Sequence, residues 1–327
     1  MFKEPPMNRA ALRADIMLII LATIWGSGFV AQRAAMDSMG PYTFTALRFA
    51  IGTIILLPVL IARHRKTLKN GANKNRANRP VRAQADTNLL VRSALLGGVL
   101  LGVLMAAAAS VQQVGMVSTT ASRGGFITGL YVLFVPAFGL LLRQRAGVGH
   151  VLGAGLAAGG LWLLSGDLSG GIHLGDMLIL LCAVLWALHV VLLGVLAPRS
   201  DPIGLAAVQF VVVAVLVGVL AILFERDSMG TLVHGLVPLL YSGIFAIGIA
   251  FTLQIFAQQH APAAHAAVLM SLEAVFAAIF GTLLLGERLT KTEILGCALM
   301  FSGMLISQLW PHKRTRAELD EFKDPVR

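Results

Sequence analysis

The segment DIMLIILATIW at residues 15–25 recurs, with one internal slip, as DMLILLCAVLW at residues 176–186. The two copies both begin with an aspartate and end with a tryptophan, 161 residues apart. Further pairs keep a constant spacing: Pro41 with Pro202 and Arg48 with Gln209 at 161 residues, and Arg145, Gly153 and Gly160 with Arg288, Gly296 and Gly303 at 143 residues. Agreement at fixed offsets along most of the chain indicates an internal duplication.

The composition is that of a membrane protein. Of the 327 residues, 57% are hydrophobic and 13% are charged, whereas about a quarter of the residues in a soluble domain are charged. Apolar runs of roughly 20 residues recur along the chain, and a helix of that length crosses a ~30 Å hydrocarbon core. The runs lack the alternation of a membrane β-barrel, and helices satisfy their own backbone groups in lipid. We therefore expect an all-α integral membrane protein.

Ten transmembrane helices are predicted from these runs and the turns between them. The expected spans are 14–36, 42–62, 92–117, 121–142, 147–165, 175–197, 203–224, 236–257, 264–285 and 292–310. Five fall in a first repeat, residues 14–165, and five in a second, residues 175–310. Because five is an odd number, the second repeat enters the membrane from the opposite side, so the repeat is inverted. Inverted repeats have two near-equivalent arrangements, which is the basis of alternating access in transporters.

Positive charges lie mostly on one side of the predicted membrane. The chain has 26 Lys and Arg and a net charge of +10, and most of these residues precede the first span or fall in segments 63–91 and 311–327. The positive-inside rule therefore places both termini in the cytoplasm, in a multi-pass protein of the cell (inner) membrane. We expect 63–91 to be a flexible basic loop and 311–327 a basic tail, both near anionic membrane lipids rather than nucleic acid.

The cysteines indicate whether disulfides form, and the glycine spacing indicates where helices pack closely. Cys182 and Cys297 fall in different predicted spans, so no disulfide framework is expected. The span 147–165 contains Gly149-xxx-Gly153 and Gly155-xxx-Gly159, spacings that permit close helix packing. We interpret them as internal packing in a monomer, and a homodimer through this face is the alternative.

Four motifs stand out in the paired halves: IWGSGFVAQRAAM at 24–36, LRF at 47–49, TTASRGGFITGLYVLFVP at 119–136 and SLEAVFAAIFGTLLLGERLT at 271–290. They resemble the EamA family of the drug/metabolite transporter superfamily, and the resemblance covers about residues 15–309. It implies a ten-helix bundle in which helices 1–4 and 6–9 surround a central cavity and helices 5 and 10 are peripheral. Members of that family export amino acids, other metabolites or toxic cations. Where the family pattern reads Ser-Leu-Glu-Pro, this chain has Ala274.

Glu273 is the candidate proton-coupling residue. It lies about ten residues into its span, ~14 Å deep and near the membrane centre. Ionisable residues at such depth are costly and usually face an interior or a watery path, and an apolar environment favours the protonated carboxyl. Under the 143-residue offset it corresponds to Leu130, so the repeated scaffold does not demand an acid there. A structural carboxyl that binds a neighbouring helix is the alternative.

Arg48 is the candidate carboxylate-binding residue. It lies roughly 10 Å inside the second span, whereas Arg123 lies nearer the edge of its span. Either guanidinium could bind a substrate carboxylate through two hydrogen bonds. The alternative for both is snorkelling to the interface or capping of a neighbouring helix. Only Arg48 is within vertical reach of Glu273.

The other candidate substrate-binding residues are polar or aromatic side chains at helical spacing. Trp25 and Trp186 occupy matching midspan positions, where they line a cavity or fill the core. His189 is a cavity-lining donor or a core histidine with a partner. Buried amides and hydroxyls need hydrogen-bond partners, either in a cavity lining or between helices; these candidates are Gln113, Tyr131, Gln209, Gln254 and Gln258.

The sequence carries no catalytic or cofactor signature such as HExxH, a phosphate-binding loop or a spaced Cys/His cluster. We therefore expect no enzyme activity, cofactor or metal. Glu273 and His265 lie about 12 Å apart along one helix, too far for direct acid–base cooperation. The expected function is secondary active transport: proton-coupled export of small polar or amphipathic molecules, such as amino acids, by alternating access. The alternatives are a flippase-like transporter of lipid-linked substrates and drug or organic-cation efflux.

Overall fold

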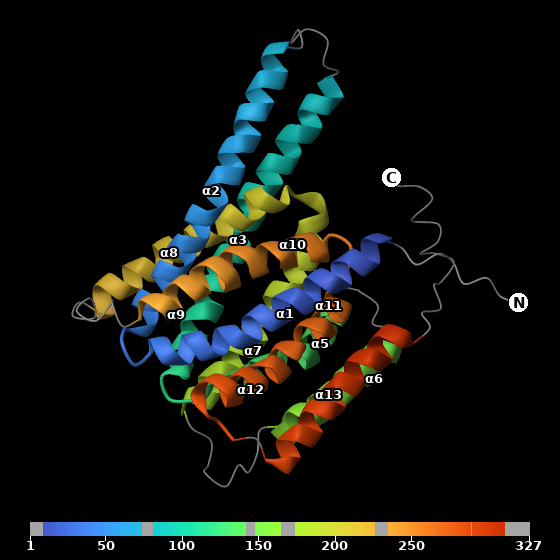
Figure 1. Cartoon of the computed structure of the whole chain (residues 1–327). Coiled ribbons are helices and arrows are strands. Elements are labelled where there is room, and N and C mark those ends of the chain that lie inside the picture. The colour runs from blue at the N-terminus through green and yellow to red at the C-terminus, as the bar shows by residue number, and fades with distance from the viewer. Residues whose placement is uncertain are drawn as a thin grey trace, which may run out of the picture.

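The computed structural model describes residues 9–73, 81–141, 148–164, 174–225, 235–288 and 290–310, and every regular element in these ranges is helical (Figure 1). The predicted all-α class is confirmed. Eight helical segments of this described part are long and apolar enough to cross a membrane, and two shorter apolar helices accompany them, Val151–Gly160 and Ile294–Gly303.

The helices of the first half are α1 (Arg9–Ala35), α2 (Pro41–Asn73), α3 (Val81–Met116), α4 (Ala121–Gly129), α5 (Tyr131–Leu141) and α6 (Val148–Leu164). Those of the second half are α7 (Leu174–Leu196), η3 (Ala197–Arg199), α8 (Pro202–Phe224), α9 (Leu236–Tyr241), η5 (Ser242–Phe251), α10 (Thr252–Gln258), α11 (Ala263–Met270), α12 (Leu272–Leu285) and α13 (Lys291–Leu309).

Carboxylates from one half bind helix starts of the other. Glu225, at the end of α8, accepts the backbone N–H groups of Tyr42 and Thr43 at 2.8 and 2.7 Å, at the start of α2. Glu287 accepts the N–H groups of Ala121 and Ser122 at 3.1 and 3.2 Å, at the start of α4. The first N–H groups of a helix have no partner within it and favour negative charge. These acids therefore join the two halves at the helix ends.

Three of the predicted spans are not continuous α-helices. The fourth is divided into α4 and α5 at Leu130, and the ninth into α11 and α12 at Ser271, although Ala274 stands where a proline would explain a kink. The eighth span consists of α9, η5 and α10, and η5 is a π-helix of 10 residues. Both features are frequent where helices build functional sites.

The basic segment 63–91 differs from the expected flexible loop. The helix α2 continues to Asn73 and α3 begins at Val81, so the two extend from the bundle as a helical hairpin (Figure 1). Both extensions continue helices already nucleated in the spans, and their Ala, Arg, Lys and Leu residues favour helix. Residues 74–80 and the expected tail 311–327 lie outside the described residues.

Most helix contacts in the bundle are made between the two halves. The helix α1 packs on α12, α3 packs on α7 and α8, and α2 packs on α8 and η5. The helices α6 and α13 lie side by side at the edge of the bundle (Figure 1). They approach closely because glycines without a Cβ lie at their contact. A Cβ added at Gly160 would lie only 2.5 Å from the carbonyl oxygen of Gly296, and one added at Gly303 only 2.6 Å from that of Gly153.

Candidate functional site

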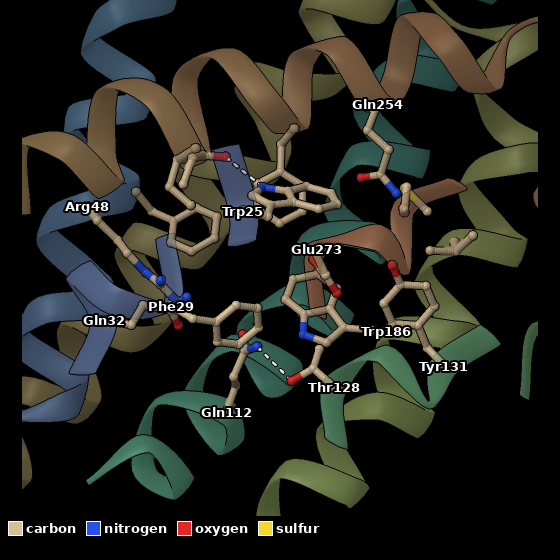
Figure 2. Close-up of a pocket in the computed structure, with 16 residues that line it drawn as sticks. Trp25, Phe29, Gln32, Arg48, Gln112, Thr128, Tyr131, Trp186, Gln254 and Glu273 are labelled. Atoms are coloured by element: carbon tan, nitrogen blue, oxygen red, sulfur yellow. Dashed lines mark hydrogen bonds between the residues drawn. The ribbon is translucent and has the colours of Figure 1, made fainter. Parts of the chain in front are cut away.

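A small cavity with a volume of about 50 Å³ lies among α1, α2, α3, α4, α5, α7, η5, α10, α11 and α12 (Figure 2). Most of the predicted site residues line it: Trp25, Arg48, Tyr131, Trp186, Gln254 and Glu273. A volume of this size has room for a few water molecules, whereas pockets for small molecules measure roughly 300–1,000 Å³. The site therefore has too little free volume for a small-molecule substrate in this structure.

Two ionisable side chains share this cavity without an ion pair in the described part of the chain. Glu273 is 3% exposed and Arg48 is 4% exposed. Among the described residues, Glu273 Oε1 and Arg48 Nε have no hydrogen-bond partner. The Arg48 guanidinium carbon lies 5.2 Å from the ring centre of Phe44 and 5.6 Å from that of Phe49, within the range of cation–π attraction. Buried charged groups with free bonding capacity are expensive unless a ligand satisfies them.

The helix breaks place Glu273 and Tyr131 at the cavity. Glu273 lies in the first turn of α12, just after the break at Ser271, and Tyr131 is the first residue of α5, just after the break at Leu130. Figure 2 shows the Tyr131 hydroxyl on the same side of the cavity as the Glu273 carboxyl. Next to Trp25, Gly26 lets α12 come close, since a Cβ there would lie 2.7 Å from the carbonyl oxygen of Glu273.

Aromatic rings form another wall of the cavity. The ring centre of Phe251 lies 4.6 Å from that of Trp25, 5.5 Å from that of Trp186 and 6.2 Å from that of Phe49. Trp25 donates its indole N–H to the carbonyl oxygen of Ala246 at 3.1 Å. Ala246 and Phe251 both belong to η5, so the π-helical segment supplies this wall and fixes one tryptophan.

Four predicted site residues lie outside the cavity lining. His189 Nε2 and Gln209 Oε1 are 2.9 Å apart, and Gln209 also donates to the Leu205 carbonyl at 3.3 Å. Gln113 donates to the Gln32 carbonyl at 3.2 Å, and Gln258 donates to the Val190 carbonyl at 2.8 Å. Apart from the bond between Gln209 and Leu205 within α8, these bonds link different helices, which corresponds to the structural alternative considered for each residue.

Several lining residues were not predicted. Gln112, rather than Gln113, faces the cavity and donates to Thr128 Oγ1 at 3.2 Å. Gln32 also lines the cavity, and its Oε1 lacks a partner among the described residues. The two adjacent glutamines in VQQVG, residues 111–115, were the sequence signal that could have indicated Gln112. Phe251 is one of 16 phenylalanines, and nothing in the sequence distinguished it from the others.

Two contacts between an acidic and a basic side chain lie beyond the cavity, near helix starts, and the one with His265 is an ion pair when this histidine is protonated. Asp15 on α1 lies 2.8 Å from His265 on α11, and Asp176 on α7 lies 2.8 Å from Arg123 on α4. Asp15 and Asp176 are the matched first residues of the repeated segment. Each pair thus joins a helix of one half to a helix of the other.

The fold and site are those of a membrane protein with a polar cavity among its spans. The model of the EamA-like transporter family matches residues 12–166 and again residues 173–308, so the chain belongs to this family. It is a membrane transporter, and the family and relatives' names indicate no enzyme class.

Relatives and a solved structure agree with this assignment. An "Uncharacterized transporter" of Archaeoglobus fulgidus is 30% identical over 299 residues, which are 91% of this chain and 86% of the relative. The "Uncharacterized inner membrane transporter YedA" of Escherichia coli is 26% identical over 89% of both chains. One crystal structure superposes with a TM-score of 0.69 at 20% identity, covering 90% of this chain and 96% of the other, and so shares the fold.

Proposed function

We propose that the protein is a secondary active transporter that couples proton movement to the export of small polar or amphipathic molecules, with amino acids and related carboxylates as the substrate class. The observation that carries this proposal is the cavity that contains both Arg48 and Glu273 with unused bonding capacity, beside the rings of Trp25, Trp186 and Phe251. A carboxylate and an apolar group in one small molecule would complement this lining.

Each part of the lining has a separate task in the proposed cycle. Arg48 binds the substrate carboxylate through its planar fork of N–H donors. The aromatic rings contact the apolar part of the substrate and exclude water. Glu273 takes up a proton on one side of the membrane and releases it on the other, while the substrate moves in the opposite direction. Because the present cavity is so small, the site must widen when substrate binds.

We further propose that the chain forms ten transmembrane helices in two inverted repeats, with α6 and α13 as the fifth helix of each. Three observations support this. The family model matches both halves. The glycines that correspond between the halves meet reciprocally, Gly160 at Gly296 and Gly303 at Gly153, as expected for a twofold relation. The matched aspartates Asp15 and Asp176 both form ion pairs with the other half.

The ion pairs give the two repeats a means of alternating access. Successive spans run in opposite directions, so the starts of α1 and α11 lie at one end of the bundle and the starts of α4 and α7 at the other. Breaking the pair between Asp15 and His265 would loosen one end, and breaking the pair between Asp176 and Arg123 would loosen the other. Basic residues before the first span and in the α2–α3 hairpin favour a cytoplasmic location for the first end. Reporter fusions to each terminus test that orientation.

Transport in proteoliposomes tests the role of Glu273. The variant Glu273→Gln keeps the size and hydrogen-bonding shape of the side chain but cannot exchange a proton. We expect proton-driven substrate movement to be lost, while exchange of labelled for unlabelled substrate continues. The control is Asp37→Asn, which removes a carboxylate at an exposed position and should leave transport unchanged. If Glu273→Gln transports normally and still responds to a proton gradient, the coupling proposal is wrong.

Organic-cation efflux is the second candidate, because Glu273 and two tryptophans are also suitable partners for a cation. The two candidates differ in their dependence on Arg48. Arg48→Gln should abolish binding of a carboxylate substrate, whereas binding of an organic cation should stay the same or improve once the repelling charge is gone. Thermal-shift titrations of the unaltered protein and of Arg48→Gln with amino acids and organic cations separate these cases.

A further inference from the structure

A second cavity of about 540 Å³ opens at the side of the bundle between α3, α7 and α8. Its size falls in the range of roughly 300–1,000 Å³ typical of small-molecule sites. No residue lines both this groove and the central cavity. The groove is therefore a separate feature, and the proposed transport cycle does not use it.

The sequence of α3 explains why the groove exists. Closer to the start of α3, Gly98 and Gly102 lie so near α8 that a Cβ at either would come within 2.7 Å of a valine side chain. Farther along α3, Ala106, Ala107 and Ser110 face α7 and α8 with short side chains. The helices are held close at one end, and the small residues leave the space at the other end unfilled.

The groove opens toward the lipid. The helices that line it, which are α3, α7, α8 and, through Tyr42, the start of α2, all belong to segments long and apolar enough to span the membrane. Its rim residues Val103 and Val219 are each 50% exposed, and Leu216 is 42% exposed. A void of this kind would lose the packing energy of its lining, so in a bilayer a hydrocarbon chain is the natural occupant.

Two hydroxyl-bearing residues, Ser110 and Tyr42, distinguish the groove from an ordinary lipid-facing surface. Ser110 is only 8% exposed, and its hydroxyl has no hydrogen-bond partner in the described ranges. Other helical hydroxyls in the bundle donate to the carbonyl four residues earlier, as Ser27, Thr53 and Thr252 do. Ser110 lies six residues before the end of α3, so its hydroxyl is about 9 Å from that end, in the half of the membrane nearest the start of α2.

We propose that the groove binds one acyl chain of a membrane phospholipid. The ester carbonyl accepts from the Ser110 hydroxyl once this hydroxyl turns toward the groove, and the acyl chain lies from there along α3 toward Val103, between Leu178 of α7 and Leu216 of α8. The fit combines a largely apolar channel of ligand size with two hydroxyl-bearing residues, Ser110 and Tyr42, in its lining. A free fatty acid would lack the headgroup anchor that keeps a phospholipid in this leaflet.

Native mass spectrometry and photolabelling test the proposal on the whole protein in nanodiscs. The probe is a phosphatidylethanolamine with a diazirine in one acyl chain. We expect labels to concentrate on residues 103–114 of α3 and 216–220 of α8, and one lipid to stay bound after mild detergent extraction. Ala107→Trp fills the groove from its exposed edge and should abolish both signals, and Ser110→Ala should weaken lipid retention about two- to tenfold.

The matched control is Leu96→Trp, because Leu96 is also on α3, is 65% exposed and lies outside the groove. It should leave labelling and retention unchanged. Uniform labelling of all lipid-facing helices, or unchanged labelling in Ala107→Trp, would overturn the proposal. So would a change of oligomeric state in Ala107→Trp, because a second copy would then cover the groove, or loss of labelling on addition of a transported solute.

Discussion

At the scale of single residues, the central cavity keeps a guanidinium and a carboxyl buried without an ion pair among the described side chains. Such groups destabilise a membrane protein unless they are needed. Other buried polar side chains nearby form hydrogen bonds within the protein: His189 bonds to Gln209, and Gln258 donates to a backbone carbonyl. Under the proposed function, Arg48 and Glu273 keep this bonding capacity for a substrate and a proton, whereas His189, Gln209 and Gln258 connect helices.

Substitution of Arg48 should therefore separate stability from function. Arg48→Leu removes a buried charge but keeps an apolar contact with Phe44 and Phe49, so we expect the free energy of unfolding to rise by about 1 kcal/mol or more while binding of a carboxylate substrate is lost. Thermal unfolding in detergent and substrate titration measure the two effects. Arg33→Leu, at a partly exposed position, is the control and should change neither. A lower Tm for Arg48→Leu would mean that the guanidinium supports the fold.

At the scale of helices, the spans were predictable and their interruptions were not. A helix that crosses a membrane needs about 20 apolar residues, and eight of the ten expected spans correspond to helical segments long and apolar enough to do so. The break at Ser271 has no proline or glycine beside it in the sequence, so no local signal predicted it. The helical hairpin formed by α2 and α3 was not predicted, because the polarity and charge of segment 63–91 were taken to indicate a flexible loop.

The close contact between α6 and α13 leads to a prediction about the stability of a glycine variant. A side chain at Gly160 would collide with the backbone of Gly296, so Gly160→Leu should destabilise the protein by about 1–3 kcal/mol through overpacking. Gly155 lies on the same helix, and a Cβ added there would meet no atom within 4 Å, so Gly155→Leu is the matched control. Thermal unfolding compares the two. Equal Tm values would show that α6 and α13 do not pack in this way.

At the scale of the whole molecule, the two halves share a scaffold but differ in their ionisable groups. Reciprocal glycine contacts and paired aspartates appear in both halves, whereas Glu273 and Arg48 correspond to Leu130 and Gln209. The duplication seen in the sequence agrees with the match of the family model to both halves. It could not predict which face of each helix points inward: Gln112 lines the cavity and its neighbour Gln113 does not, because one residue turns the helix by about 100°.

The ion pairs at the two ends lead to opposite expectations for cavity access. Single-cysteine variants at Gln112 can be labelled with an impermeant reagent from either side of the membrane. Asp176→Asn should increase labelling from the end where α4 and α7 begin, and Asp15→Asn from the other end. Partly exposed ion pairs contribute up to about 1 kcal/mol, so we expect changes of roughly two- to fivefold.

The control for this experiment is Arg33→Gln, which removes an exposed ion pair with Asp37 within one stretch of chain. This ion pair does not connect the two halves, so the variant should leave labelling unchanged. If Asp15→Asn and Asp176→Asn act on the same side, the two ion pairs do not close opposite ends.

The small volume of the central cavity has a consequence for energy conservation. Only a few water molecules fit around Glu273, which is 3% exposed. A continuous chain of water across the membrane would conduct protons and dissipate the proton gradient. A cavity of this small volume leaves little room for such a chain. Under the proposed mechanism, a proton held on Glu273 would cross only when the protein itself rearranges, so few protons would leak without moving a substrate.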